Sequence, residues 1–402
     1  MVSKLLLIRY EEIGLKGRNR YKFENKLISN IKHGLAPLGR TKITTLRNRM
    51  LLDIGEIDPG EAVECLRRVF GIASFSPVTR VEADEKLIYE TAKTTLMEAL
   101  EREEITPGEN GKEISYRVTV KRADKSFPIS SMDLASRIGA YLMDNIPGLK
   151  VDLHNPRMVV SVDIRQGQAY VFSETIPGPG GLPVGVSGKG ILFLSGGIDS
   201  PVAGWLAMKR GIEIEAVHFH SFPFTGEKSK EKVKDLCRVL TNYGGQVKLH
   251  MVHFTDIQKA IHQNCPPSFR ITVMRRFMFR IGQRIAENSG ALALVTGESV
   301  GQVSSQTLEN MAAINKVTVM PVLRPLITYD KLEIIKMAQK IGTYDISIQP
   351  YEDCCTLFLP KGPITIKPNM GKILKTESLL DVDGLIEDAL EKTETFNFTW
   401  EG

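Results

Sequence analysis

The sequence has few cysteines and no long hydrophobic segment. Five cysteines among 402 residues are a small and odd number, which argues against a disulfide framework. No run of about 18 uninterrupted apolar residues is present, so we predict no membrane span. The first apolar run ends at Arg9 and is too short and too charged for a secretory signal. We therefore expect a cytoplasmic protein that does not associate with membranes.

Positive charge is concentrated at the N-terminal end. Residues 1–50 contain twelve lysines and arginines against three glutamates, whereas residues 51–110 contain fourteen acidic residues against six basic ones. A basic segment at one end of a chain favours a polyanionic partner such as a nucleic acid. A basic solvated face without any partner is the alternative that composition alone leaves open.

A segment rich in glycine and proline divides the chain. PGPGGLPVGVSGKG, residues 177–190, contains too many of both residue types for a regular element, so we place the main domain boundary there. Its GVSGKG end resembles part of a Walker phosphate loop, but the spacing differs and we interpret it as linker. Two small α/β units are predicted before this boundary, over residues 1–75 and 76–175, and a larger unit over residues 176–402.

The two small units show helical and strand periodicity. Apolar residues at helical spacing predict helices over 20–35 and 61–70 in the first unit, and over 85–103 in the second. Two stretches late in the second unit, MVVSVDIR and QAYVFSETI, are typical of strands and predict a hairpin that turns at Gln166 and Gly167.

The larger unit alternates apolar runs with helical stretches of ten to twenty residues. This order is typical of a doubly wound parallel sheet. In such sheets ligands bind beyond the carboxyl ends of the strands. We therefore expect the loops that follow Leu194, Phe219, Val295 and Leu326 to meet around one site.

The stretch ILFLSGGIDSP places a glycine turn between a strand and the start of a helix. Ser195, Gly196 and Gly197 can turn sharply and let backbone amides approach an anion. Ser200 is the predicted N-cap, with Pro201 as the first helical residue. The positive end of the helix dipole then lies at the turn, which predicts a phosphate site.

This turn has no lysine of the Walker type to hold a γ-phosphate, so it suits pyrophosphate as a leaving group. We expect Asp199 to lie near the accompanying metal or near the amides of the turn. Lys331 follows Asp330, a predicted N-cap, and would project from a helix start beside the strand ends. There it would neutralise charge as pyrophosphate departs, although a solvated lysine is the alternative.

Several longer stretches, together with the glycine turn, resemble the PP-loop ATP pyrophosphatases and, among them, the tRNA 4-thiouridine synthetase (tRNA sulfurtransferase, ThiI) family. The stretches of the larger unit are AVHFHS (216–221), TVMRR (272–276), TGESVGQVSSQTLENM (296–311), RPLITYDKLEII (324–335) and YDISIQPYEDCC (344–355). YRVTVKRADKSFPISS and VDLHNPRMVVSVDIR resemble the RNA-binding THUMP domain, and IRYEEIGLKGRNR resembles the family's N-terminal ferredoxin-like domain. The resemblance runs over nearly the whole chain.

The resemblance implies an enzyme that depends on ATP and Mg²⁺. It would adenylate the uridine at tRNA position 8 and then transfer persulfide sulfur to form 4-thiouridine. The matching nucleotide contacts are Phe193, Leu194, His218, Phe219, Arg275, Gly297 and Gln306. Gly297 would permit close approach, and Arg275 can offer a planar fork of donors to phosphate. A surface salt bridge is the alternative for Arg275.

The pair of cysteines in EDCC fits the same resemblance. Cys354 matches the family cysteine that carries the persulfide, because a thiolate can accept sulfur and present it to an electrophilic carbon. Family members with a rhodanese domain keep a second active cysteine there. The sequence ends at Gly402 without such a domain, so the thiol that resolves the persulfide stays open between Cys355, Cys265, Cys237 and an external reductant.

The remaining thiols and histidines have plainer interpretations. Cys237 lies at the apolar spacing of a helix over 227–243, and Cys65 is similar, so we predict both in the core. A zinc site from Cys354, Cys355 and the pairs His218/His220 or His250/His253 lacks the usual spacing, and we predict no protein metal site.

An RNA partner is expected from both charge and resemblance. The predicted RNA contacts are Lys16, Arg18, Arg20, Lys121, Arg122 and Lys125. Such residues bind the phosphate backbone and follow RNA shape, while the target uridine leaves its tertiary contacts to reach the site. The resemblance further implies a cysteine desulfurase as sulfur donor, a link to the sulfur carrier protein of thiazole synthesis for thiamine, and a homodimer.

Two other functions compete. Another PP-loop enzyme, such as an amidating ligase or a 2-thiolating enzyme, would share the glycine turn, but no glutaminase or ammonia route is visible. An RNA-binding protein with an inactive nucleotide site is disfavoured by the intact SGGIDS stretch.

Overall fold

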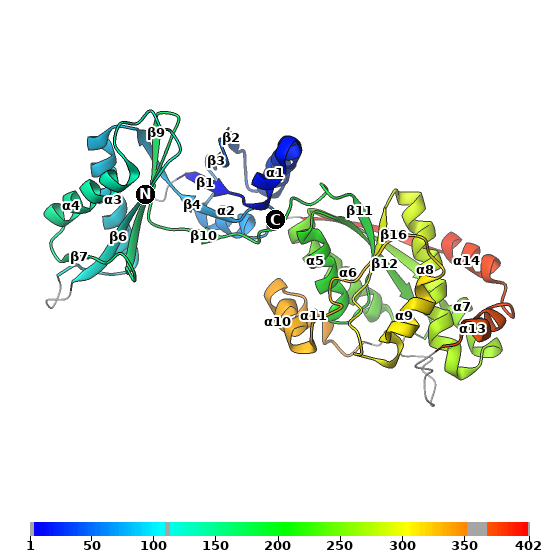
Figure 1. The fold of residues 1–402 in the computed structure, drawn as a ribbon. Coiled ribbons are helices and arrows are strands. Elements are labelled where there is room, and N and C mark those ends of the chain that lie inside the picture. The colour runs from blue at the N-terminus through cyan, green and yellow to red at the C-terminus, as the bar shows by residue number, and fades with distance from the viewer. Residues whose placement is uncertain (1–3, 109–112, 225, 352–367, 401–402) are drawn as a thin grey trace. The chain divides into compact units, whose positions relative to one another are not determined.

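The computed structural model describes residues 4–108, 113–224, 226–351 and 368–400 (Figure 1). The chain forms two compact units, Met1–Glu24 with Ile31–Gly180, and Asn25–Asn30 with Gly181–Gly402. No helix within the described ranges has the length and apolar character needed to cross a bilayer. Cys354 and Cys355 lie outside the described residues.

The first sheet of the N-terminal unit is antiparallel, with strand order β10-β4-β1-β3-β2. Its strands are β1 (Leu5–Arg9), β2 (Lys42–Leu46), β3 (Arg49–Asp53), β4 (Ser74–Pro77) and β10 (Ile176–Pro177). The central strand β1 buries Leu6, Leu7 and Ile8 completely or nearly so. Two short turns, η1 (Glu12–Leu15) and η2 (Gly17–Asn19), lead from β1 into the helix α1.

The predicted helix over 20–35 is confirmed as α1 (Arg20–Leu35), which buries Leu27, Ile31 and Leu35. The helix predicted over 61–70 is displaced, since α2 spans Pro59–Leu66. The physical reason is the cap at its start. The Asp58 carboxylate accepts hydrogen bonds from the amides of Gly60 and Glu61, and Pro59 is the first helical residue.

The second sheet of the same unit has the order β5-β9-β8-β6-β7. Its elements are β5 (Thr79–Glu82), α3 (Glu85–Arg102), β6 (Ile114–Arg122), α4 (Ser131–Asn145), β7 (Leu149–Val151), β8 (Met158–Arg165) and β9 (Gln168–Phe172). Figure 1 shows α3 and α4 together against this sheet, where they enclose a core that includes Leu96, Ile138 and Val160. The predicted hairpin is confirmed, and its turn residues Gln166 and Gly167 both have positive φ.

The sheet of the C-terminal unit has the order β15-β14-β11-β12-β13-β16. Its strands are β11 (Lys189–Phe193), β12 (Glu213–His220), β13 (Gln246–His253), β14 (Ala293–Val295), β15 (Val322–Leu323) and β16 (Glu394–Thr399). The first five run parallel, as predicted, and β16 joins the edge antiparallel to β13. The sequence analysis did not predict β16, whose residues are half exposed and weakly apolar.

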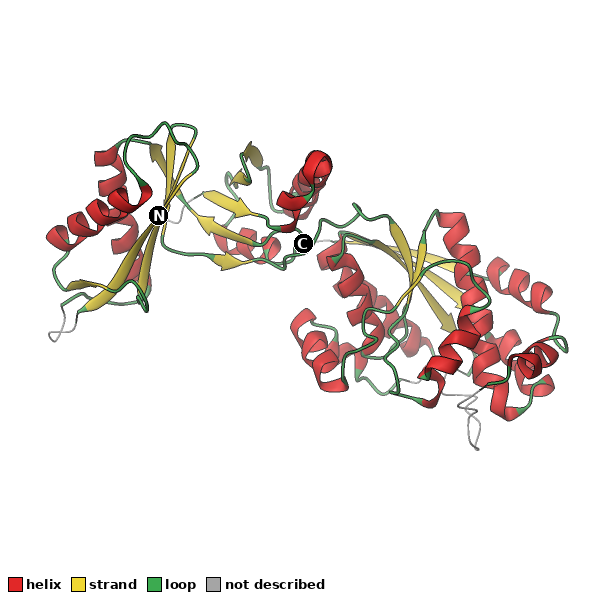
Figure 2. Cartoon of the chain, in the orientation of Figure 1, coloured by secondary structure: helices red, strands yellow, loops and turns green. Residues whose placement is uncertain are grey.

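Helices cover both faces of this sheet, which confirms the doubly wound architecture (Figures 1 and 2). In sequence order they are α5 (Asp199–Lys209), α6 (Glu227–Gly244), α7 (Thr255–Asn264), α8 (Arg270–Ser289), α9 (Leu308–Asn315), α10 (Lys331–Ile341), α11 (Tyr344–Ser347), α13 (Met370–Glu377) and α14 (Val382–Glu391). Two short 3-10 turns, η4 (Pro267–Phe269) and η5 (Ser304–Gln306), connect them. Figure 1 shows α5 and α6 on one side of the strands, and α7, α8 and α14 on the other.

The side chains of β11 explain how both faces are filled. Successive strand residues point to opposite faces, so Leu192 meets α5 while Phe193 meets α8. A Cβ atom on Gly282 of α8 would lie 2.5 Å from Cζ of Phe193. Glycine at this position therefore lets α8 approach the carboxyl end of β11, where it forms one wall of the cavity described next.

Candidate functional site

A cavity of about 270 Å³ opens at the carboxyl ends of β11, β12 and β14. Its lining comprises Phe193, Leu194, Ser195, Asp199, Ser200, Val217, His218, Phe219, Arg275, Met278, Phe279, Thr296, Gly297, Glu298 and Gln306. Nine of the eleven residues expected to bind the nucleotide belong to this lining, and Gly196 and Gly197 of the turn do not. The expected meeting of the loops after Leu194 and Val295 is therefore confirmed. The chain around Phe219 contributes the end of β12 and not the loop after it, and the loop after Leu326 contributes through polar contacts.

The turn at residues 195–200 is closed by its own hydroxyl groups. The Ser200 hydroxyl accepts a hydrogen bond from the Ser195 amide (2.9 Å) and donates one to the Ser195 carbonyl oxygen (3.2 Å). The Gly197 amide donates to the Ser195 hydroxyl (3.2 Å). The prediction of Ser200 as N-cap is wrong, because α5 already begins at Asp199 and Ser200 uses its hydroxyl across the turn. Pro201 accordingly lies in the first helical turn but is not its first residue.

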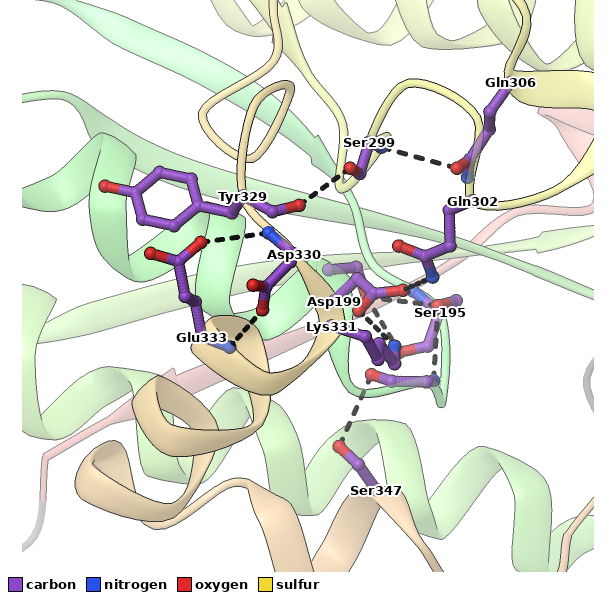
Figure 3. A network of polar contacts seen from close by, with 12 residues as sticks. Ser195, Asp199, Ser299, Gln302, Gln306, Tyr329, Asp330, Lys331, Glu333 and Ser347 are labelled. Carbon is purple, nitrogen blue, oxygen red and sulfur yellow. Dashed lines mark hydrogen bonds and ion pairs between the residues drawn. The ribbon is translucent and has the colours of Figure 1, made fainter.

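Asp199 lies between two donors from a distant part of the chain (Figure 3). Nε2 of Gln302 donates to Oδ2 of the carboxylate (2.9 Å), and the Lys331 ammonium donates to Oδ1. Lys331 and Asp199 are 43% and 21% exposed, so this ion pair faces solvent at the mouth of the site. The structure thus brings together Asp199, expected near the metal or the amides of the turn, and Lys331, expected to neutralise the departing pyrophosphate.

The start of α10 is fixed by reciprocal capping, as predicted for Asp330. Its carboxylate accepts from the Glu333 amide (2.9 Å), while the Glu333 carboxylate accepts from the Asp330 amide (3.0 Å) (Figure 3). The Ser299 hydroxyl donates to the Tyr329 carbonyl oxygen (2.9 Å), which joins the segment after β14 to this helix start. These contacts hold Lys331 at the glycine turn.

A buried carboxylate orients Arg275. Glu298 is 2% exposed and binds Arg275 through Oε1 and the Arg324 guanidinium through Oε2 (2.7 Å). Burial alone would raise the pKa of Glu298, but the charges of Arg275 and Arg324 outweigh burial and hold the pKa below its ordinary value. Arg275 is therefore not held by a surface salt bridge, and its guanidinium borders the cavity.

Sequence reasoning missed the roles of Glu298 and Arg324. Both residues stand within stretches that carry the family resemblance. Glu298 lies three residues after the buried strand β14, and Arg324 directly follows the half-buried strand β15. A charged residue at the carboxyl end of a buried parallel strand is the signal that could have identified them.

Two further residues shape the cavity. His218 is buried, and its Nδ1 atom hydrogen bonds with the Leu194 carbonyl oxygen (2.8 Å), which fixes the ring beside the end of β11. A Cβ atom on Gly297 would lie 2.8 Å from the Ser200 amide nitrogen. The close approach that requires glycine here is therefore between the end of β14 and the start of α5.

The described residues contain no group of three histidine, cysteine or acidic side chains arranged to hold a metal ion. His220 and His253 pack edge to face with ring centroids 5.2 Å apart. Burial, followed by the charge of Lys230, lowers the pKa of His220 to about 3, so this ring is neutral near pH 7. Cys354 and Cys355, the cysteines of the zinc site that the sequence analysis disfavoured, lie outside the described residues.

The three described cysteines are buried, as predicted for Cys65 and Cys237. Burial raises the pKa of Cys65 to about 12 and that of Cys265 to about 11, and it raises the pKa of Cys237 further. Cys237 lies on the buried face of α6, and Cys265 lies in the core at the end of α7. All three thiols are therefore protonated and poorly reactive at neutral pH.

The six basic residues expected at RNA differ in their surroundings. Arg20 donates to the Glu24 carboxylate (2.8 Å) and to the Tyr10 hydroxyl (2.8 Å). Arg122 donates to two backbone carbonyl oxygens of the loop that follows β6. The other four residues are more accessible; Arg18, Lys121 and Lys125 are exposed, and Lys16 is half-buried.

Comparisons with known proteins cover nearly the whole chain. Residues 185–382 match a family described as thiamine biosynthesis protein (ThiI), residues 5–76 the ThiI ferredoxin-like domain, and residues 82–174 the THUMP domain. A probable tRNA sulfurtransferase of Halothermothrix orenii is 50% identical over 398 residues, covering 97% of this chain and 98% of the relative. One of Brevibacillus brevis is 48% identical over 395 residues, covering 98% and 96%.

Two solved structures resemble the fold over most of the chain. A 4-thiouridine synthetase in complex with RNA and ATP has a TM-score of 0.87 at 39% identity, covering 98% of this chain and 99% of that one. The protein PH1313 from Pyrococcus horikoshii has a TM-score of 0.63 at 27% identity, covering 84% and 99%.

Proposed function

Because the chain belongs to the ThiI family of tRNA sulfurtransferases, we propose that it uses ATP to convert a tRNA uridine, at position 8, to 4-thiouridine. The observation that supports this proposal is the cavity at the glycine turn, whose lining contains nine of the eleven residues expected to bind the nucleotide, all but Gly196 and Gly197. The solved relative that is similar over the full chain is a 4-thiouridine synthetase with bound ATP and RNA.

In the proposed complex, adenosine lies against the ends of β11 and β12, beside Phe193 and Phe219. The phosphates extend toward the amides of the turn, where the start of α5 adds the positive end of its dipole. Arg275 is held at the cavity by Glu298 and is placed to donate to phosphate. Mg²⁺ would neutralise phosphate charge. It commonly binds one or two carboxylates together with substrate phosphates, and Asp199 fits as a protein ligand.

The proposed reaction has three steps. The uracil O4 atom first attacks the α-phosphorus of ATP, which forms an adenylated base and releases pyrophosphate toward the turn and Lys331. The terminal sulfur of a Cys354 persulfide then attacks C4, and AMP leaves. A thiol finally cleaves the sulfur–sulfur bond, which leaves 4-thiouridine on the RNA and a disulfide between the thiol and Cys354.

The structure narrows the choice of the resolving thiol. Cys237 and Cys265 are buried and have raised pKa values, so neither supplies a thiolate near pH 7. We therefore propose that Cys355 or an external reductant completes the cycle. A cysteine desulfurase would supply the persulfide, and the same sulfur could pass to the carrier protein of thiazole synthesis. A cytoplasmic homodimer remains part of this proposal.

We propose that RNA binds the N-terminal unit, organised as a ferredoxin-like domain over residues 1–75 and a THUMP domain over residues 76–175. The exposed Arg18, Lys121 and Lys125 are accessible to RNA phosphates. Arg20 and Arg122 serve first to fix the loops that carry their neighbours, because their guanidinium groups are already bonded within the protein.

The test is incubation with ATP, tRNA and a persulfide donor, followed by assays for 4-thiouridine and pyrophosphate. Wild-type protein should form both, whereas Cys354→Ser should release pyrophosphate without forming 4-thiouridine. Cys65→Ala, at a buried thiol of the N-terminal unit, is the matched control and should form both. An amidating ligase would be insensitive to Cys354→Ser, and an RNA-binding protein with an inactive site would release no pyrophosphate.

A further inference from the structure

The loop after β14 extends a glutamine to the glycine turn. Gln302 is exposed, and its Nε2 atom donates to Oδ2 of Asp199 (2.9 Å), while Lys331 binds the other oxygen of the same carboxylate (Figure 3). Each oxygen of Asp199 therefore has a donor of its own, one neutral and one charged. The sequence analysis assigned a role to Asp199 and to Lys331 but none to Gln302.

The backbone of this loop fixes the place of Gln302. The Gly301 amide donates to the Gln306 carbonyl oxygen (3.0 Å), and the Gln302 amide donates to the Ser299 carbonyl oxygen (3.4 Å). Gly301 has a φ of +77°, a conformation that glycine adopts readily and other residues rarely do. The Ser299 hydroxyl bonds to the Tyr329 carbonyl oxygen, so the closed loop is also attached to the segment before α10.

The neutral amide has a property that a second cation would lack at this position. An amide N–H can orient a carboxylate without neutralising its charge. A bound polyphosphate would attract Lys331, and Mg²⁺ binds a carboxylate best when the negative charge is not already paired. A donor that orients Asp199 and leaves its negative charge available is therefore well suited to this turn.

We propose that Gln302 is a positioning residue that holds the Asp199 carboxylate at the glycine turn while Lys331 binds the phosphates, and that it thereby strengthens binding of ATP as its Mg²⁺ complex. This inference rests on the proposed function. Asp199 lines the cavity assigned to adenosine and Gln302 does not, so Gln302 acts on the ligand through Asp199. Its effect falls on the phosphate end of the nucleotide and not on the base.

The experiment measures equilibrium binding of Mg²⁺-ATP, and of AMP without Mg²⁺, to the full-length protein by calorimetry. Gln302→Met keeps the length of the side chain and removes the donor, so affinity for Mg²⁺-ATP should fall about 3- to 10-fold, as expected for loss of an exposed hydrogen bond to a charged group. Affinity for AMP should stay within about twofold, because the residues that line the cavity are unchanged. Gln339→Met, at an exposed glutamine of α10, is the matched control and should bind both ligands as wild type does.

A double-mutant cycle separates positioning of Asp199 from a general effect on the loop. In Asp199→Ala, which has no carboxylate to hold, adding Gln302→Met should change the affinity for Mg²⁺-ATP by less than about twofold. Equal losses with and without the Asp199 carboxylate would overturn the inference, and so would equal losses for AMP and Mg²⁺-ATP, since both results indicate a disturbed loop. Wild-type affinity in Gln302→Met would overturn it as well. A wild-type protein that binds no Mg²⁺-ATP would instead refute the proposed function.

Discussion

Buried charged residues lie at both ends of the strands of the C-terminal sheet, but their surroundings differ. At the amino end, Lys189 donates to the Glu215 carboxylate (2.6 Å), and His250 hydrogen bonds with the other oxygen of Glu215 (2.9 Å). These groups satisfy one another. At the carboxyl end, Glu298 binds Arg275 and Arg324, and Asp199 binds Lys331. Asp199, Arg275 and Glu298 also line the cavity.

The difference shows which end is built for a ligand. Charges that neutralise each other stabilise the fold and leave no charge for a partner. At the carboxyl end, the charged side chains of Asp199, Arg275 and Glu298 line a cavity, where a bound polyphosphate can contact them. The carboxyl ends of parallel strands are also where loops converge, so the same topology that creates the cavity brings these charged residues together.

The largest expected effect is at Lys331. Lys331→Met removes a cation from the departing pyrophosphate, and the kcat for pyrophosphate release should fall about 100- to 1000-fold, as for other groups that stabilise developing charge. Lys189→Met at the amino end is the counterpart, and its kcat should stay within about twofold for correctly folded protein. Steady-state assays of both variants measure the two kcat values. A comparable loss of kcat in both variants would contradict the difference between the two ends of the sheet.

Glu298 should affect both binding and stability. Glu298→Gln leaves the half-buried Arg275 and Arg324 without their shared negative charge, and we expect the unfolding free energy to drop by about 2 kcal/mol. The KM for ATP should rise about tenfold because Arg275 is no longer held at the cavity. Denaturant unfolding and initial rates test the two effects, and a variant with wild-type KM would show that Glu298 does not orient Arg275.

The amino-end network should respond to acid. Burial tends to raise the pKa of Glu215, but hydrogen bonds from His250 and Lys189 outweigh it and lower the pKa to about 2, from an ordinary value of 4.5. A lowered folded-state pKa adds stability above the unfolded-state pKa, and this stability is lost as pH falls from 4.5 toward 2. Wild type should therefore exceed Glu215→Gln in stability by about 1–2 kcal/mol at pH 6, allowing for solvent screening.

Unfolding measured at pH 6, 4 and 3 tests this linkage. The stability difference between wild type and Glu215→Gln should narrow at each step toward acid. A difference independent of pH would mean that the Glu215 carboxylate titrates alike in the folded and unfolded protein.

The smallest effect is expected at the buried thiols. Cys237→Ala and Cys265→Ala should each cost about 1 kcal/mol of stability, because a buried sulfur is removed. Formation of 4-thiouridine with an external thiol should stay within about twofold of wild type. Loss of turnover in Cys265→Ala, with the melting temperature preserved, would identify Cys265 as the resolving thiol after all.

Local patterns allowed much of this architecture to be predicted. The α1 helix, the hairpin turn at Gln166 and Gly167, and the capped start of α10 at Asp330 follow from spacing and capping within a few residues. The glycine turn was located in the same way. The hydrogen bonds of its hydroxyl groups could not be predicted. Whether Ser200 caps the helix or bonds across the turn depends on the residue at which the helix begins.

Contacts between distant residues could not be predicted. The link between Lys232 and Gln349 joins residues 117 positions apart, and Arg20 and Arg122 bond to partners that only the folded backbone brings near. The edge strand β16 depends on pairing with β13, since its own sequence is weakly apolar. Charge and periodicity identify such residues as exposed or basic, while packing decides what they bind.

The most direct measurement of the central claim is the release of labelled pyrophosphate from [γ-³²P]ATP with and without tRNA. The account predicts that unmodified tRNA stimulates pyrophosphate release strongly, and that Asp199→Asn abolishes the stimulation while the protein stays folded. Release of inorganic phosphate in place of pyrophosphate, or pyrophosphate release indifferent to both tRNA and Asp199, would contradict the assignment of this sheet end to ATP-driven tRNA thiolation.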